Sequence, residues 1–295
     1  MGSFRVTERS IATNVLTNLQ NNITRISDTQ QQLSSGKLIS RASDNPGGAV
    51  AAMQLRSDIS RHQQYGRNAD DGVGWLGVAD ATLTTVVEQV NRVRDLVLQG
   101  MNTAATGPDA LQSLAGEVSE IQSSVLNLAN SKYLDRPIFG GTTDGATAFT
   151  ASGTYTGDSG TVLRTVGDNT KVRVDVDGQA AFGAGATQLF TVLADAATSL
   201  TTNTSNLAAV LNNIDTAASA LRAAQSSVGA RYNQLTSTRQ ASEDRVLSLT
   251  TQLSDIEDID LPKTITDLQL RQTAYQAALA ATAKVVQPSL VEFLR

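Results

Sequence analysis

Three glycines in the first third of the chain have the spacing of a nucleotide-binding loop. Residues 72–77 are Gly-Val-Gly-Trp-Leu-Gly, which satisfies the G-x-G-x-x-G pattern that binds the pyrophosphate of a dinucleotide. That chemistry requires a β-strand directly before the first glycine and a βαβ unit around it. Residues 63–68 are polar and have no strand pattern, so the motif is weak evidence for a nucleotide site. We instead expect the three glycines to lie inside a long helix, where each lowers helix stability by about 1 kcal/mol relative to alanine. That cost is tolerable where another helix approaches closely and Trp75 packs nearby.

A single histidine and the lack of cysteine restrict catalytic chemistry. His62 is the only histidine, so at most one Ser-His-Asp arrangement and no histidine-rich metal site can form. Its neighbours Arg61, Gln63 and Gln64 are polar, which favours a surface histidine over a general base. Without cysteine, the chain has no disulfide, thiolate nucleophile or zinc–sulfur site.

Four carboxylates gather late in the chain. Asp255, Glu257, Asp258 and Asp260 suggest calcium binding or paired-carboxylate catalysis. The glycine and the closing glutamate of an EF-hand loop are missing, however. We therefore expect a solvated junction between two helices, and we predict no catalytic, cofactor-binding or metal-binding residue anywhere in the chain.

The bulk composition favours long helices and argues against charged polymers as partners. Hydrophobic residues make up 40% of the chain but aromatic residues only 4%, which suits helices packed through Leu, Val and Ala. A net charge of −5 argues against nucleic acid or an anionic membrane as the main partner. No run approaches the roughly 18 apolar residues of a membrane helix. Residues 1–10 contain no apolar segment, so a cleaved secretory signal is not expected.

Both ends of the chain carry apolar residues at alternating steps of three and four, the pattern of a coiled coil. The N-terminal stripe comprises Leu16, Leu19, Ile23, Ile26, Gln30 and Leu33. The C-terminal stripe comprises Ile265, Leu268, Gln272, Tyr275, Leu279, Thr282, Val286 and Ser289. Polar residues interrupt both stripes, and such a helix is marginal in water unless a partner covers it. We predict that the two ends pair with each other and then with other subunits.

The predicted assembly interface consists of the hydrophobic members of both stripes, with Phe293 and Leu294 at its C-terminal end. Each buried Leu or Ile contributes about 1.5–3 kcal/mol. Five on each helix can offset the ordering cost that leaves each end loose in the free chain.

Between the ends, helical patterns surround a segment with strand patterns. We expect helices from near residue 7 to 35, from 46 to about 101 and from 109 to about 132, with a turn at Gly107-Pro108. Period-two alternation predicts strands at 161–166 and 171–176, with turns at 167–169 and 177–178.

Helices resume near residue 187, and a long helix among them has a polar middle. Arg231, Thr238, Ser242 and Arg245 lie on its otherwise apolar stripe, which we expect to meet neighbours across a wet interface. Pro262 then begins the last helix.

The predicted fold is mainly α with a small inserted β-domain, an elongated helical bundle formed by paired N- and C-terminal segments. The expected domains are residues 1–43 with 257–295 as a terminal helical pair, 44–137 with 186–256 as a helical rod, and 138–185 as the β-domain.

Several motifs resemble those of the flagellins and their relatives. The matching runs are residues 32–39 (QLSSGKLI), 43–49 (SDNPGGA), 67–72 (RNADDG), 92–96 (RVRDL) and 287–295 (QPSLVEFLR). Residues 133–142 (YLDRPIFGGT) resemble the hook-associated protein 3 branch of this superfamily more closely than the filament flagellins. The resemblance covers residues 5–142 and 205–295 and does not extend in detail through the β insertion.

This resemblance implies a non-enzymatic structural subunit, extracellular in the bacterial flagellum, at the junction between hook and filament. The implied partners are hook-associated protein 1, flagellin, further copies of the chain in a helical ring, and an export chaperone at the C-terminal helix. Export would use the flagellar type III pathway without cleavage, and no cofactor, nucleic acid or membrane is implied. Two alternatives stay open: a filament-forming flagellin, and a helical effector or translocator of a related secretion system.

Overall fold

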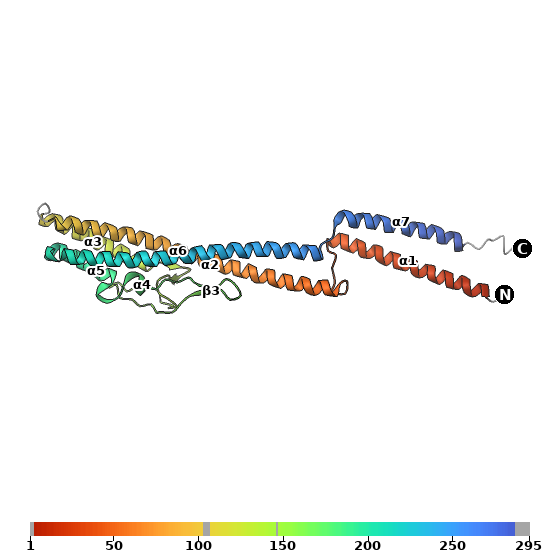
Figure 1. Cartoon of the computed structure of the whole chain (residues 1–295), viewed down its shortest axis with the longest axis horizontal. Coiled ribbons are helices and arrows are strands. Elements are labelled where there is room, and N and C mark those ends of the chain that lie inside the picture. The colour runs from red at the N-terminus through yellow and green to blue at the C-terminus, as the bar shows by residue number, and fades with distance from the viewer. Residues whose placement is uncertain (1–2, 103–106, 146, 287–295) are drawn as a thin grey trace. The chain divides into compact units, whose positions relative to one another are not determined.

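The computed structural model describes residues 3–102, 107–145 and 147–286 (Figure 1). The helices are α1 (Ser3–Ser35), α2 (Pro46–Met101), α3 (Pro108–Ala129), α4 (Gly178–Phe182), α5 (Leu189–Thr202), α6 (Leu207–Glu257) and α7 (Leu261–Val286). The strands are β1 (Lys132–Tyr133), β2 (Arg136–Pro137), β3 (Leu163–Thr165) and β4 (Lys171–Arg173). The chain divides into two compact units: a terminal unit, Met1–Ser60 with Val246–Arg295, and a central unit, Arg61–Arg245.

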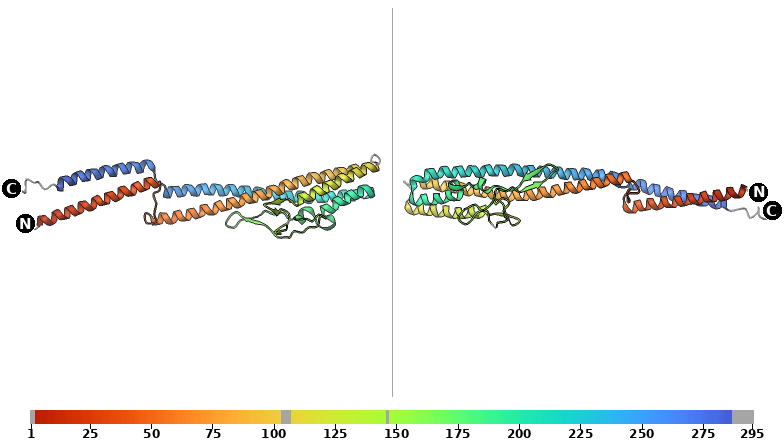
Figure 2. Two further views of the ribbon diagram at one scale, coloured as in Figure 1. Left: turned by 180° about the vertical axis from the view of Figure 1, so that it is seen from behind. Right: turned by 90° about the horizontal axis from the view of Figure 1, so that it is seen from below.

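In the terminal unit, α1 and α7 pack against each other along their length and run antiparallel (Figures 1 and 2). The first turns of α2 and the last turns of α6 belong to the same unit. The predicted pairing of the two chain ends is therefore confirmed.

The core of the central unit lies between α2 and α6. The α2 residues with strict three–four spacing are all buried: Leu76, Ala79, Leu83, Val86, Val90, Val93 and Val97. On α6 the buried residues include Ile214, Leu221, Val228 and Leu235. Polar pairs align the two helices at the rim, where the Gln225 amide donates to Thr84 Oγ1 over 2.8 Å and Arg94 pairs with Asp215 over 2.7 Å. Burial at the predicted spacing confirms the mainly α, paired-segment fold.

Helices α3 and α5 lie side by side in the same unit and carry the inserted segment (Figure 2). The insertion is organised by packed aromatic rings. The ring centroid of Phe149 lies 5.3 Å from that of Phe182 and 5.1 Å from that of Phe190, and the centroids of Phe139 and Phe182 are 5.0 Å apart. The Asn130 amide, just after α3, bonds both the N–H and the C=O of Phe149. The few aromatic residues of the chain therefore concentrate where helix packing alone cannot order the backbone.

The strands are shorter than predicted but pair as expected. β3 and β4 form an antiparallel hairpin in which Arg164 faces Val172. The turn predicted at residues 177–178 is wrong, because the Asp177 carboxylate accepts from the N–H groups of Gln179 and Ala180 and thus caps helix α4. A second hairpin, β1–β2, was not predicted, because its strands have only two residues each.

The polar middle of α6 has an intramolecular explanation at one position. Arg231 was expected to face neighbouring molecules, but its guanidinium donates to the carbonyl oxygens of Arg173 and Asp175. It thereby fastens the end of β4 to α6.

The G-x-G-x-x-G motif lies inside α2, as the structural interpretation predicted. A Cβ at Gly72 would lie 2.7 Å from Leu235 Cδ1, and a Cβ at Gly74 would lie 2.6 Å from the Tyr133 hydroxyl. The Tyr133 ring packs on buried Trp75 with 5.5 Å between centroids. With helix before the motif in place of a strand, these glycines serve packing and not phosphate binding.

Two glycines of the same helix provide a matched stability test. Gly66 has open space around its Cα, whereas Gly74 is covered by Tyr133. We expect Gly66→Ala to stabilise the central unit by up to about 1 kcal/mol, because alanine is the better helix former. Gly74→Ala should lose that gain or destabilise, because the Tyr133 ring must move off Trp75. Chemical denaturation of the two variants measures the difference, and equal gains would refute the packing role.

Candidate assembly surface

The structure divides each predicted stripe into two halves. Leu19, Ile26 and Leu33 of α1 are half-buried on the side that packs on α7. The alternating positions Leu16 and Ile23 remain 59% and 50% exposed. The pair therefore uses only half of the N-terminal stripe.

The C-terminal stripe divides in the same way. Leu268, Tyr275 and Thr282 of α7 are half-buried, whereas Ile265 and Leu279 remain 43% and 42% exposed. The side chain of Val286 and residues Phe293 and Leu294 lie outside the described part of the structure. Both helices thus present an uncovered row of large aliphatic side chains beside the contact that joins them.

Contact positions that the stripes omit are also part of the pair. Thr29 is buried, at 6% exposure, and its hydroxyl donates to the Arg25 carbonyl oxygen, so its polar group is satisfied. Arg271 and Ala278 of α7 are half-buried. All three are polar or small, so a search for large apolar residues passes over them.

A compact joint, residues 36–38 and 257–259, fixes the inner end of the helical pair. The Ile259 amide donates to the Gly36 carbonyl over 3.2 Å, and the Leu38 amide donates to the Glu257 carbonyl over 2.5 Å. Gly36 has a φ of +71°, a left-handed conformation that suits glycine and ends α1. These bonds join segments more than 200 residues apart in the sequence.

The acidic cluster supplies the charges of this joint. Glu257 is buried, at 3% exposure, and its carboxylate lies 2.8 Å from Arg56 Nη2 and 3.5 Å from Lys37 Nζ. Asp258 lies 2.5 Å from Lys37 Nζ, and Asp260 accepts from the Lys263 amide at the start of α7. The expected solvated junction is correct for Asp258 and Asp260 but wrong for Glu257. No metal or catalytic role is needed to explain these carboxylates.

The charges make the joint sensitive to pH. The hydrogen bond from Lys37, followed by that from Ser254, lowers the pKa of Asp258, and the bond to Asp258 raises the pKa of Lys37. A lowered carboxyl pKa stabilises the fold above the ordinary value near 3.8, and the gain is lost as pH falls through the folded-state pKa. The raised Lys37 pKa stabilises below 10.5 and is lost at more alkaline pH.

We expect wild type to exceed Asp258→Asn in thermal stability at pH 7, with the difference shrinking below about pH 4. Circular dichroism melts of both proteins between pH 7 and pH 3 measure it. A difference that persists unchanged at pH 3 would contradict the assignment to Asp258.

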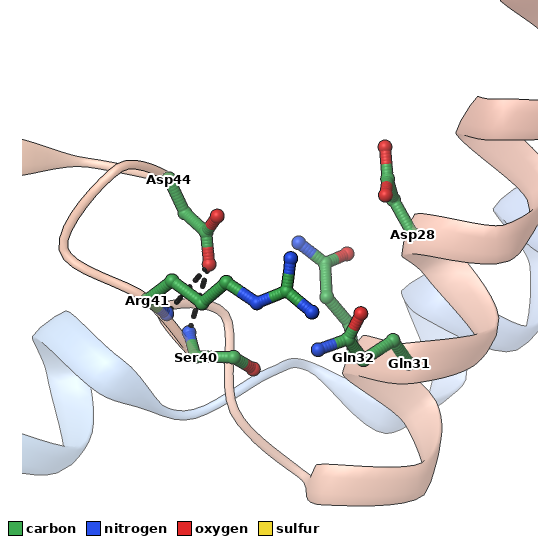
Figure 3. A pocket seen from close by; sticks show the side chains of 6 residues that line it. All are labelled: Asp28, Gln31, Gln32, Ser40, Arg41 and Asp44. Atoms are coloured by element: carbon green, nitrogen blue, oxygen red, sulfur yellow. Dashed lines mark hydrogen bonds between the residues drawn. The ribbon is translucent and has the colours of Figure 1, made fainter.

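A polar pocket of about 250 Å³ lies beside the joint (Figure 3). Asp44 accepts from the Ser40 and Arg41 amides over 3.1 and 2.8 Å and so shapes the loop between α1 and α2. Figure 3 shows the Arg41 guanidinium extending from this loop toward Gln32 of α1. Charged and amide groups line the pocket, so it suits a polar side chain better than an apolar ligand.

The lone histidine is half-buried, not fully exposed as expected. The His62 ring contacts the Tyr65 ring edge-on at 5.8 Å between ring centroids, and the Tyr65 hydroxyl donates to the Asp168 carboxylate.

In the described part of the chain, no helix is both long and apolar enough to cross a bilayer.

Comparisons with known proteins match both halves of this architecture. The model of the bacterial flagellin N-terminal helical region matches residues 6–142, and that of the C-terminal helical region matches residues 211–294. Flagellar hook-associated protein 3 of Escherichia coli (strain K12) is 25% identical over 280 residues, covering 85% of this chain and 87% of that protein. A flagellin of Halalkalibacterium halodurans is 25% identical over 282 residues, covering 94% and 93%. The chain spans only 42% of the length of Bacillus subtilis flagellin.

A solved structure supports the fold. A putative flagellar hook-associated protein from Vibrio parahaemolyticus superposes with a TM-score of 0.67 at 22% identity, over 73% of this chain and all of that one. Paired terminal segments, both helical-region matches and the length of the similarity lead to one conclusion: the chain belongs to the flagellin family, as a structural and non-enzymatic component of the bacterial flagellum.

Proposed function

We propose that this chain is the subunit that joins the flagellar hook to the filament. The observation that carries the proposal is the match to hook-associated protein 3 across 85% of the chain, through both helical halves. The motif at residues 133–142, which resembles the same branch, supports it.

The uncovered rows of α1 and α7 provide the means of joining. Leu16 and Ile23 on one helix, with Ile265 and Leu279 on the other, offer apolar area that the chain itself does not bury. Coiled-coil helices whose stripes exceed one partner bind additional helices. Terminal helices of neighbouring copies carry the same exposed aliphatic residues, and they would cover these side chains in a helical array. The half-buried stripe residues hold the intramolecular pair: Leu19, Ile26 and Leu33 of α1, with Leu268, Tyr275 and Thr282 of α7.

Partners of this chain are flagellar proteins, and we assign them by position. Hook-associated protein 1 would contact the ring from the hook side, flagellin would contact it from the filament side, and copies of the chain would lie beside one another. Before export, a chaperone would cover exposed α7 residues such as Leu270 and Leu279, which would otherwise favour aggregation.

The test is a nucleation assay on purified hooks that carry hook-associated protein 1. We expect the chain to add to the hook ends in a layer of limited length and then to permit flagellin elongation. Hooks that lack the chain should not elongate. Failure to bind hook ends, or failure to support flagellin addition, would refute the proposal.

The second candidate is a filament-forming flagellin, which the whole-length match to the Halalkalibacterium halodurans protein favours. The same assay separates the two functions. A flagellin would elongate indefinitely from seeded ends without a second protein, whereas a junction subunit stops after a short layer.

A further inference from the structure

The tip of the β1–β2 hairpin departs from what its backbone prefers. Leu134 and Asp135 form the two-residue turn, with φ of +47° and +63°. Such turns favour Asn-Gly, because a bulky side chain is strained at positive φ. Leu134 is nevertheless 74% exposed, more than Leu247 at 69% or Leu270 at 67%. A strained and exposed leucine contributes little to folding, which points to a role in contact with another molecule.

A cavity elsewhere in the central unit complements this tip. It measures about 360 Å³, and its apolar wall comes from Val176 and from Ala220, Ala223 and Ala224 of α6. Arg173 and Arg231 lie at the same cavity, together with Asp177. The cavity therefore offers its apolar wall to a branched aliphatic side chain and places two guanidinium groups beside it.

Two guanidinium groups and one carboxylate line the cavity. Arg173 pairs with buried Asp175 over 2.6 Å, and Asp177 keeps its negative charge while it caps α4. Arg231 bonds only backbone carbonyls and Ser227, and no carboxylate of the described chain forms an ion pair with it. Burial, followed by the nearby Arg173, lowers the pKa of Arg231, whereas Asp175 opposes this shift without forming an ion pair.

The hairpin and the α2–α6 contact lie on different sides of α2. Gly72 faces Leu235 of α6, and Gly74 faces Tyr133 of the hairpin. Positions two apart on a helix differ by about 200° in direction. Contact between the tip and a cavity on α6 therefore fits two neighbouring copies, in a head-to-tail arrangement that a ring or a helical array repeats.

We propose that the hairpin tip of one copy docks into this cavity of the next copy. Leu134 would lie against the alanine wall, and Asp135 would pair with Arg231. The proposal rests on the proposed function, in which copies of the chain lie side by side at the hook end.

Because the chain has no cysteine, disulfide trapping is a direct test. The chain carrying both Leu134→Cys and Ala223→Cys is added to hooks bearing hook-associated protein 1 and oxidised. We expect a ladder of covalent multimers on a non-reducing gel. Leu134→Cys paired with Asn213→Cys, an exposed α6 position outside the cavity, should give none. Normal binding to hook ends without a ladder would overturn the docking proposal and leave the proposed function intact. Failure of the unaltered chain to bind hook ends would instead refute both.

Replacement of the tip provides a second readout that does not require cysteines. Leu134→Asn with Asp135→Gly relieves the turn, so the melting temperature of the free chain should rise. Incorporation at hook ends should nevertheless fall by about tenfold or more, because the loss of an important interface contact lowers binding affinity by that much. Undiminished incorporation of this variant would contradict a docking role for the tip.

Discussion

Replacing Ile23 with aspartate is expected to abolish incorporation at hook ends while the free chain keeps its helical content. Ile23 is 50% exposed in the isolated chain, so a charge there disturbs intramolecular packing less than at the half-buried positions of the stripe. In the assembly that we propose, the same side chain is covered by a neighbouring helix. Loss of about 1.5–3 kcal/mol of burial, together with the cost of burying a carboxylate, lowers affinity at least about tenfold per contact. Sedimentation of the chain with hooks, beside circular dichroism of the free protein, measures both effects.

Ile26 is the matched control on the same helix. It is half-buried against α7, so Ile26→Asp should reduce the helical signal of the free chain before any question of assembly arises. If Ile23→Asp and Ile26→Asp behaved alike, the division of the stripe into an inner and an outer half would be wrong.

The second large effect is expected at Glu257. Glu257→Ala removes the buried carboxylate that pairs with Arg56, whereas Lys37 keeps Asp258 as its partner. Both cations are partly exposed, so the cost is below that of a fully buried pair, at about 1–3 kcal/mol. The amides of Leu38 and Ile259 bond across this joint, and their hydrogen exchange should accelerate about tenfold or more.

Asp255 serves as the control for that experiment. It lies on the same last turns of α6 and is exposed. Asp255→Ala should therefore lower the free energy of unfolding by no more than about 0.5 kcal/mol. Unchanged exchange at Leu38 in Glu257→Ala would show that the joint does not depend on its buried charge.

The sequence was sufficient to predict that the two chain ends pair, but not that α3 packs on α5. Strict spacing from Leu76 to Val97 coincides with complete burial, and the terminal stripes lie on helices that pack together. Spacing identifies a stripe, but it does not determine how far each helix rotates about its own axis. The exposed positions of Leu16 and Leu279 therefore became evident only from the packing.

The joint could not be predicted, because its contacts have no local signal. Lys37 and Asp258 meet only after both chain ends have folded back, so the acidic cluster resembled a solvated turn in the sequence. The phenylalanine cluster of the insertion was likewise invisible to period-based arguments, because its rings come from irregular segments and from short elements.

The central claim is that the α1–α7 pair of one molecule is completed only by its neighbours. Hydrogen exchange of residues 10–35, measured in the free chain and in the chain bound at hook ends, tests this claim most directly. We predict weak protection in the free chain and strong protection after assembly, with the largest change around Leu16 and Ile23. Strong protection of this segment in the dilute free chain, unchanged on binding, would contradict it.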